Sequence, residues 1–122
     1  MKIEISIPPS VNSIWRVGRA GRVHCSKRYT DWRRTAGWEL QTQRPARIMG
    51  PVIITIAAGR PDRRRRDVDG LPKAVLDLLQ AHRVIENDSL VASLTSRWDS
   101  AVTPGRIVVE VERAPQQCGA AP

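Results

Sequence analysis

The sequence predicts a single α+β domain, in which two helices pack on a small mixed or antiparallel sheet. The chain has 122 residues, enough for one modest hydrophobic core. Several short runs of alternating or continuous apolar residues are typical of strands. Two longer segments repeat apolar residues at helical spacing. We expect the domain to span residues 1–113 and residues 114–122, rich in Pro, Gln and Ala, to form a flexible tail.

The N-terminal half predicts a strand, a loop and a helix. Residues 2–7 alternate with isoleucine on one face and end at a Pro-Pro pair. Residues 12–21 form a loop rich in Arg and Gly, and residues 22–25 a short strand. A helix is expected over residues 30–43, because Trp32, Ala36 and Leu40 recur at four-residue spacing. Thr30 or Asp31 is its expected N-cap.

The C-terminal half predicts a strand, a helix and two further strands. Residues 51–58 are almost continuously apolar, which favours a central strand with both faces covered. The second helix is expected over residues 69–81, capped by Asp69. Its apolar stripe contains Leu71, Val75, Leu78, Leu79 and His82. Residues 92–98 and 106–112 are predicted strands joined by a hairpin-like loop that contains Pro104-Gly105.

The charge balance predicts a polyanionic partner. The formal net charge is +8 at pH 7, and such a field attracts nucleic acid before contact. An anionic membrane surface is the weaker alternative, because no basic amphipathic helix is visible. No apolar run approaches the length of a membrane span. Cys25 and Cys118 are isolated and lack metal-ligand spacing, so we expect them to be ordinary thiols in a reducing cytoplasm. His24 and His82 are also isolated, which favours structural roles.

Carboxylates stand directly beside a run of arginines. Arg63–Arg66 lead into Asp67 and Asp69, and Asp88 follows the second predicted helix. Carboxylates repel phosphate. Their place beside phosphate-binding arginines makes sense if a divalent cation lies between the carboxylates and the phosphate. Asp67 and Asp69 are two residues apart in an extended lead-in and can point the same way. Such an oxygen-rich set suits Mg²⁺, with Mn²⁺ as a substitute.

Lys73 is the expected cation of this site. It lies on the second predicted helix opposite the apolar stripe, where it can face a phosphate or an attacking water. Each feature alone has an ordinary explanation. An Asp-x-Asp pair is common, an arginine run is usually solvated, and Lys73 with Asp77 could form an i, i+4 pair. The ordered combination favours a metal-assisted nuclease site.

The combination resembles the RusA family of Holliday junction resolvases. The resemblance rests on Pro61 to Asp69, Leu71, Lys73, Ala74, Asp77, Leu79 and Asp88. Pro8-Pro9-Ser10 with Asn12, Gly21–His24, Ser26 and Gly105-Arg106 extend it over about residues 3–113. Two positions depart from the family pattern. Gly70 stands where the family usually has Asn, and Asn87 where it usually has an acid, with Glu86 one residue earlier.

The resemblance implies a Mg²⁺-dependent homodimer that nicks two opposed strands of a four-way DNA junction, in recombination and repair. It assigns catalysis and metal binding to Asp67, Asp69 and Asp88, and catalysis also to Lys73. The expected DNA-binding residues are Arg16, Arg63, Arg64, Arg65, Arg66 and Lys73. No small-molecule cofactor and no membrane partner are expected. The expected location is the bacterial cytoplasm, with the nucleoid, for a chromosomal or phage-encoded protein.

Two other functions stay open at this point. One is a non-catalytic or decayed protein of the same fold that only binds DNA junctions. The other is an RNA-binding or ribosome-associated basic protein. The scarcity of Phe and Tyr argues against a base-stacking platform, although the four tryptophans leave it open. The retention of all three carboxylates favours the enzyme, because a protein that only binds has no need of them.

Overall fold

A four-stranded mixed sheet forms the centre of the protein. The computed structural model describes residues 1–9, 15–17, 23–25, 27–60 and 71–115. Within them the strands run in the order β1-β6-β4-β5, namely β1 (Lys2–Ser6), β6 (Arg106–Arg113), β4 (Val52–Ala58) and β5 (Val91–Trp98). β6 is antiparallel to both of its neighbours, whereas β4 and β5 are parallel. The predicted α+β class is confirmed.

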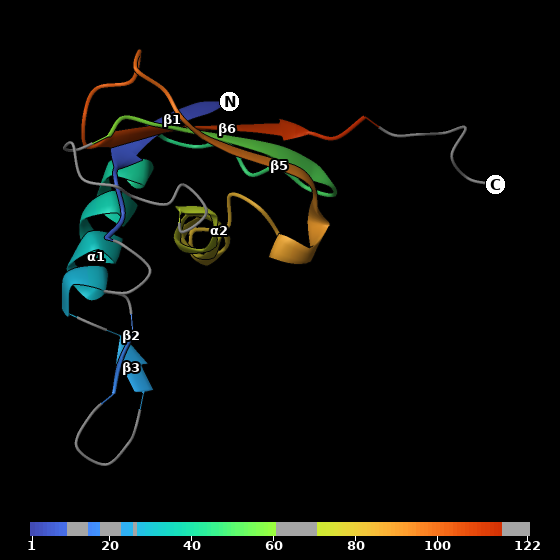
Figure 1. Cartoon of the computed structure of the whole chain (residues 1–122). Helices are drawn as coiled ribbons and strands as arrows, with labels where there is room; N and C mark the ends of the chain where they lie inside the picture. The colour runs from blue at the N-terminus through green and yellow to red at the C-terminus, as the bar shows by residue number, and fades with distance from the viewer. Residues whose placement is uncertain (10–14, 18–22, 26, 61–70, 116–122) are drawn as a thin grey trace.

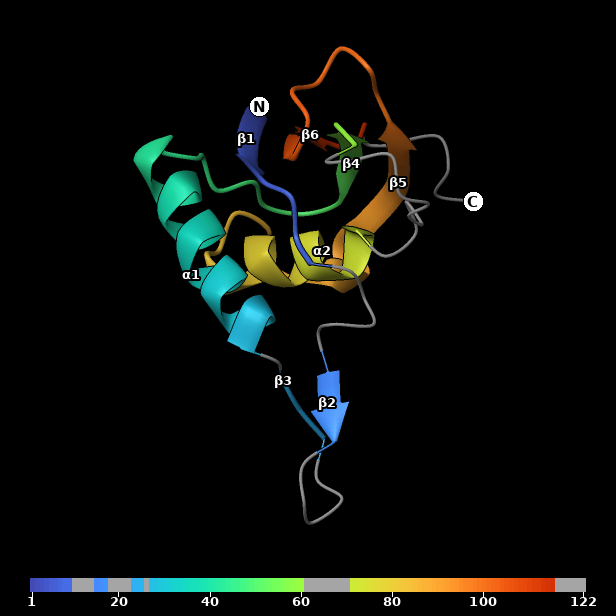
Figure 2. The ribbon, with the colours of Figure 1, turned by 60° about the vertical axis from the view of Figure 1, so that its left-hand side comes forward.

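Both helices lie on one side of the sheet (Figure 1). They are α1 (Lys27–Thr42) and α2 (Leu71–Ala81). A separate antiparallel pair, β2 (Trp15–Val17) with β3 (Val23–Cys25), lies beyond the start of α1, away from the sheet (Figure 2). Because parallel strands need a long crossover, the chain leaves β4, forms α2 and the short 3₁₀ helix η3 (Asp88–Leu90), and returns as β5.

The core lies between the sheet and the two helices. Alternate residues of β1, β4 and β6 point into it and are at most 2% exposed, as for Ile3, Ile5, Val52, Ile54, Ile56, Ile107, Val109 and Val111. β4 is central, as predicted. On the face that carries no helix, its residue Ala57 is buried, but Ile53 and Thr55 are half-exposed. The expectation that both faces of this strand are covered was therefore wrong among the described residues.

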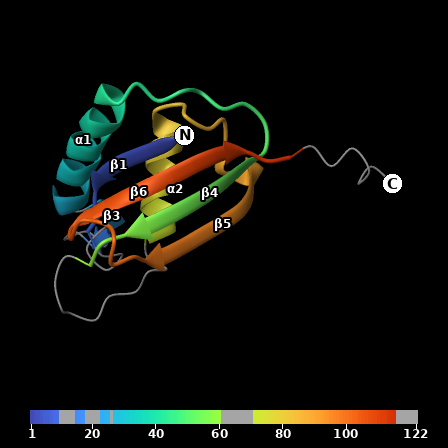
Figure 3. The ribbon, with the colours of Figure 1, turned by 90° about the horizontal axis from the view of Figure 1, so that it is seen from above.

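The predicted hairpin between the last two strands was also wrong. β4 lies between β5 and β6, and the loop over residues 99–105 passes its end (Figure 3). The loop is held there by backbone hydrogen bonds from Asp99 N–H to the carbonyl of Ala58, 2.7 Å, and from Gly105 N–H to that of Gly59, 3.1 Å. A Cβ on Gly59 would lie 2.3 Å from the carbonyl oxygen of Thr103, so only glycine fits beneath this loop.

Helix α1 begins three residues earlier than expected, at Lys27 rather than Thr30. Tyr29 extends the buried stripe and its ring stacks on that of Trp32, with centroids 5.7 Å apart. The predicted N-cap was wrong, because Thr30 and Asp31 lie inside the helix. The predicted burial of Trp32, Ala36 and Leu40 is confirmed.

Gly37 in α1 leaves room for close contact with the residue that follows α2. A Cβ built on Gly37 would lie 2.6 Å from Nε2 of His82, the residue that follows α2. The other ring nitrogen of His82 is 2.9 Å from Nε2 of Gln41, one turn further along α1. Gly37 therefore lowers the helix propensity of α1 but permits a close helix–helix contact. His82 has the structural role that its isolation in the sequence predicts.

Side chains of α1 and of the residue that follows it occupy the free edge of β1. The side-chain amide of Gln43 binds both backbone groups of Glu4, accepting at 2.9 Å and donating at 2.6 Å. Glu39 accepts from the backbone N–H of Ser6 at 2.9 Å, and the indole N–H of Trp32 donates to the carbonyl of Ser6 at 2.9 Å. These bonds satisfy the edge groups to which another strand would otherwise pair.

An ionic contact ties α1 to the sheet. The guanidinium of Arg106 on β6 hydrogen-bonds the carboxylate of Glu39 and the hydroxyl of Ser6. Burial raises the pKa of Glu39, but the hydrogen bonds from the Ser6 backbone and from Arg106 outweigh it, so the pKa lies below its ordinary value. The same contact raises the pKa of Arg106. The pair therefore favours the charged form of both groups.

Candidate active site

Helix α2 separates a buried stripe from a polar face, as the sequence predicts. Its buried residues are Leu71, Ala74, Val75, Leu78 and Leu79. Pro72 stands in the first turn, where a missing backbone N–H has no partner to lose. His82, the predicted last member of the stripe, lies beyond the helix and is half-exposed. The predicted N-cap Asp69 lies outside the described residues, and the described helix begins at Leu71.

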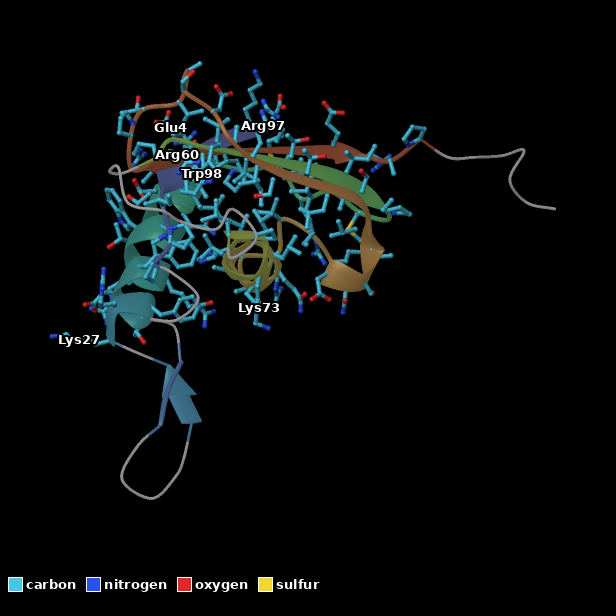
Figure 4. All side chains as sticks on the ribbon, viewed as in Figure 1. Glu4, Lys27, Arg60, Lys73, Arg97 and Trp98 are labelled. Atoms are coloured by element: carbon cyan, nitrogen blue, oxygen red, sulfur yellow. The ribbon has the colours of Figure 1, made fainter. Side chains whose placement is uncertain are left out.

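Lys73 occupies the polar face of α2. It is exposed, and its side chain points away from the sheet (Figure 4). Among the described residues its ammonium group has no hydrogen-bond or ion-pair partner. In particular, the structure forms no ion pair between Lys73 and the half-buried Asp77 within the part of the chain that it describes. Lys73 is therefore placed to meet an anion from solution.

Asp88 is the first residue of η3, and its backbone is fixed on both sides. Its N–H donates to the side-chain oxygen of Gln80 in the last turn of α2, at 3.0 Å. The side chain of Asn87 caps η3 by accepting from the backbone N–H of Ser89 at 2.9 Å. The carboxylate of Asp88 is exposed. It has no hydrogen-bond or ion-pair partner among residues 1–9, 15–17, 23–25, 27–60 and 71–115.

Of the two departures from the RusA pattern, Asn87 and Gly70, the structure describes only Asn87. Asn87 has a local role as the cap of η3. Its neighbour Glu86 is directed elsewhere, since it accepts the backbone N–H of Gly50 at 2.6 Å. Gly70 lies outside the described residues.

Lys73 and Asp88 lie near opposite ends of α2. Gln80, which holds Asp88, is seven residues after Lys73, so the two ends are separated by roughly 10 Å along the helix axis. Asp67, Asp69 and Arg63–Arg66 lie outside the described residues. The backbone of Arg16 is described, opposite His24 in the β2–β3 pair. The described residues contain no cluster of three metal-ligating side chains.

Two residues that support the site were not identified from the sequence. Asn87 followed by Asp and Ser is a pattern typical of an Asx turn, so its capping role could have been predicted. Nothing in the local sequence around Gln80 indicates that its side chain reaches Asp88, because this contact depends on how the chain returns after α2.

Comparison with known proteins defines the class. The family described as endodeoxyribonuclease RusA matches residues 5–112. The chain belongs to the RusA family of endodeoxyribonucleases, as its motifs led us to expect. It is similar to the crossover junction endodeoxyribonuclease RusA of Aquifex aeolicus (strain VF5), with 34% identity over 74 residues. That alignment covers 60% of this chain and 59% of the Aquifex protein.

No helix in the described part of the chain is long and apolar enough to cross a membrane.

Proposed function

We propose that this protein is a Mg²⁺-dependent endonuclease that resolves four-way DNA junctions by paired symmetric nicks, in DNA recombination and repair. Membership of the RusA family over residues 5–112 is the observation that carries the proposal. The net charge of +8 supports a DNA partner. The exposed Lys73 and Asp88 provide a cation and a carboxylate near the two ends of α2. The proposed place of action is the bacterial nucleoid, for a chromosomal or phage-encoded protein.

The proposed metal ligands are Asp67, Asp69 and Asp88. Carboxylate oxygens are the donors that Mg²⁺ and Mn²⁺ prefer. The described member of this set fits the role, because the Asp88 carboxylate is exposed on a fixed backbone and has no protein cation beside it among the described residues. A metal bound there would polarise the phosphodiester and activate water.

The remaining residues act on the phosphate. We assign Lys73 to catalysis, where its ammonium group would stabilise negative charge on the phosphate during cleavage. Arg16, Arg63, Arg64, Arg65 and Arg66 are proposed to hold the DNA backbone. Such contacts position the DNA but do not read its sequence.

A homodimer is part of the proposal, because two opposed nicks need two sites related by a two-fold axis. The two sheet edges differ in a way that supports it. The β1 edge is occupied by side chains of α1 and of Gln43. The β5 edge is not covered by any other described strand. It also carries Leu94, which is 40% exposed, and the half-buried Leu76 of α2 lies on the same side of the sheet.

Separating binding from chemistry tests the proposal. Asp69→Asn and Asp88→Asn each remove a metal ligand and also relieve repulsion of phosphate. Junction affinity should hold or rise while nicking is lost. Asp31→Asn is the matched control, since Asp31 is exposed on α1 and its change should leave nicking intact. Wild-type nicking by either site variant would contradict the assignment. A wild-type protein that binds junctions without nicking them would be the non-catalytic alternative.

A further inference from the structure

An arginine outside the arginine run lies on a tryptophan at the end of the sheet. The guanidinium carbon of Arg60 is 4.7 Å from the ring centroid of Trp98. Arg60 follows the end of β4 by two residues, and Trp98 is the last residue of β5. These strands are parallel neighbours, so their carboxyl ends meet at the same end of the sheet. Open sheets with parallel strands commonly bind ligands beyond that end.

The backbone around this pair is held firmly. Asp99, which follows Trp98, donates its N–H to Ala58 at 2.7 Å, and Gly59 donates its N–H to Arg106 at 2.9 Å. Trp98 itself is half-buried and packs against the core. An arginine stacked on such a fixed ring loses less freedom when it binds an anion, because its plane is already oriented.

Arg60 has no acidic partner among the described residues. Asp99 follows Trp98, and both of its carboxylate oxygens are engaged. One accepts the backbone N–H of Ala101 at 2.9 Å, and the other lies 3.5 Å from the guanidinium of Arg97. The exposed guanidinium of Arg60 therefore retains N–H donors for an outside acceptor.

The side chains of Arg60 and Arg97 lie on opposite faces of the sheet. Trp98 is in register with the buried Ala58, on the face that carries the helices, and Arg97 is in register with Ala57 on the other face. In Figure 4, Arg97 projects on the opposite side of the sheet from Lys73. Arg60, stacked on Trp98, thus belongs to the helix side, where Lys73 is exposed.

We infer that Arg60, oriented by Trp98, binds a phosphate of the DNA in addition to the arginine run. The inference rests on the proposed function for its ligand and assigns a new contact to that site. Arg60 supplies the charge and the donors. Trp98 is a positioning residue that acts through Arg60 and need not touch the DNA.

The charge of Arg60 and the positioning role of Trp98 predict different effects on DNA binding. Affinity for a labelled four-way junction is measured against salt, in EDTA so that the DNA stays intact. Arg60→Gln should weaken binding about fivefold and reduce the magnitude of the slope of log affinity on log salt by about 0.9. Trp98→Leu should weaken binding about threefold and leave the slope unchanged, because the charge remains. In the Arg60→Gln background, Trp98→Leu should cause no further loss.

Two further variants serve as controls for the charge and for the packing. Arg97→Gln removes the same charge from the other face and should leave the slope nearly unchanged. Trp98→Phe keeps an aromatic ring, and its junction affinity should fall between those of wild type and Trp98→Leu. If Trp98→Leu is thermally unstable, Trp98→Phe still separates the effect of the aromatic ring from that of lost packing. An unchanged slope in Arg60→Gln, an equal effect of Arg97→Gln, or additive losses in the double variant would overturn the inference.

The outcome also separates this inference from the function on which it rests. If the wild type nicks junctions and Arg60→Gln binds them equally well, the contact is wrong and the proposed function stands. If the wild type binds no DNA, both are wrong.

Discussion

The backbone N–H of Asp88 donates a 3.0 Å hydrogen bond to the side-chain oxygen of Gln80, in the last turn of α2. This bond joins the proposed metal ligand to the helix that also carries Lys73. The backbone that carries this carboxylate is therefore held by a residue outside the proposed set of metal ligands.

Gln80→Ala should slow junction nicking about tenfold, because small displacements of a catalytic group cost large factors in rate. Junction affinity should change little, since Gln80 is uncharged. Single-turnover nicking with saturating enzyme measures the effect. Gln41→Ala is the control, because it removes an equivalent amide that contacts His82 instead of Asp88. Equal rates for Gln80→Ala and wild type would show that this bond does not position the carboxylate.

The Glu39–Arg106 pair predicts an acid-sensitive part of the stability. The pKa of Glu39 is lowered in the folded protein, so its contribution is complete above the unfolded value of about 4.3 and is lost as the pH falls through the lowered folded pKa. Glu39→Gln keeps an oxygen for Ser6 but loses the charge, and should cost about 1 kcal/mol at neutral pH.

Chemical unfolding of wild type and Glu39→Gln across the acid range measures this difference. Their free energies of unfolding should converge as the pH falls below the folded pKa of Glu39. Glu112→Gln is the control, since Glu112 is exposed and has no ion-pair partner among the described residues. A difference that stays constant with pH would mean that the charge of Glu39 does not contribute.

Assembly through the β5 edge can be tested with a charged substitution. Leu94→Lys places a charge on the uncovered edge strand and should convert a dimer of twice 13.6 kDa into monomers. Light scattering at micromolar concentration gives the mass. Trp38→Lys is the control, because Trp38 is 72% exposed on α1 and should not affect assembly. A dimer that survives Leu94→Lys would place the interface elsewhere.

The sequence was sufficient for features that depend on local periodicity. Trp32, Ala36 and Leu40 are buried as their spacing predicts, and Lys73 faces away from the stripe of α2. The start of α1 was misplaced because Tyr29, one more member of the same stripe, was not counted. Thr30 and Asp31 are common N-cap residues, but Tyr29 is buried in the same stripe, so the helix begins before them.

Strand order could not be derived in the same way, since it depends on contacts between distant residues. The short connection over residues 99–105 favours a hairpin locally. β4 nevertheless inserts between the two strands, pairing Ile54 with both Leu94 and Val111. The supports of Asp88 and Arg60 come from Gln80 and Trp98, which no motif connects to them. The roles of Asp67, Asp69 and the arginine run, outside the described residues, stay predictions from the sequence.

Metal-dependent cleavage of a branched DNA is the proposed activity, and one assay tests it. A four-way junction labelled on each strand in turn is incubated with the protein in Mg²⁺ or in EDTA, beside a linear duplex of the same sequence. We predict paired nicks at symmetric positions on two opposed strands of the junction, in Mg²⁺ alone, with little cutting of the duplex. Equal cutting of both DNAs, or nicking that persists in EDTA, would contradict the proposed function.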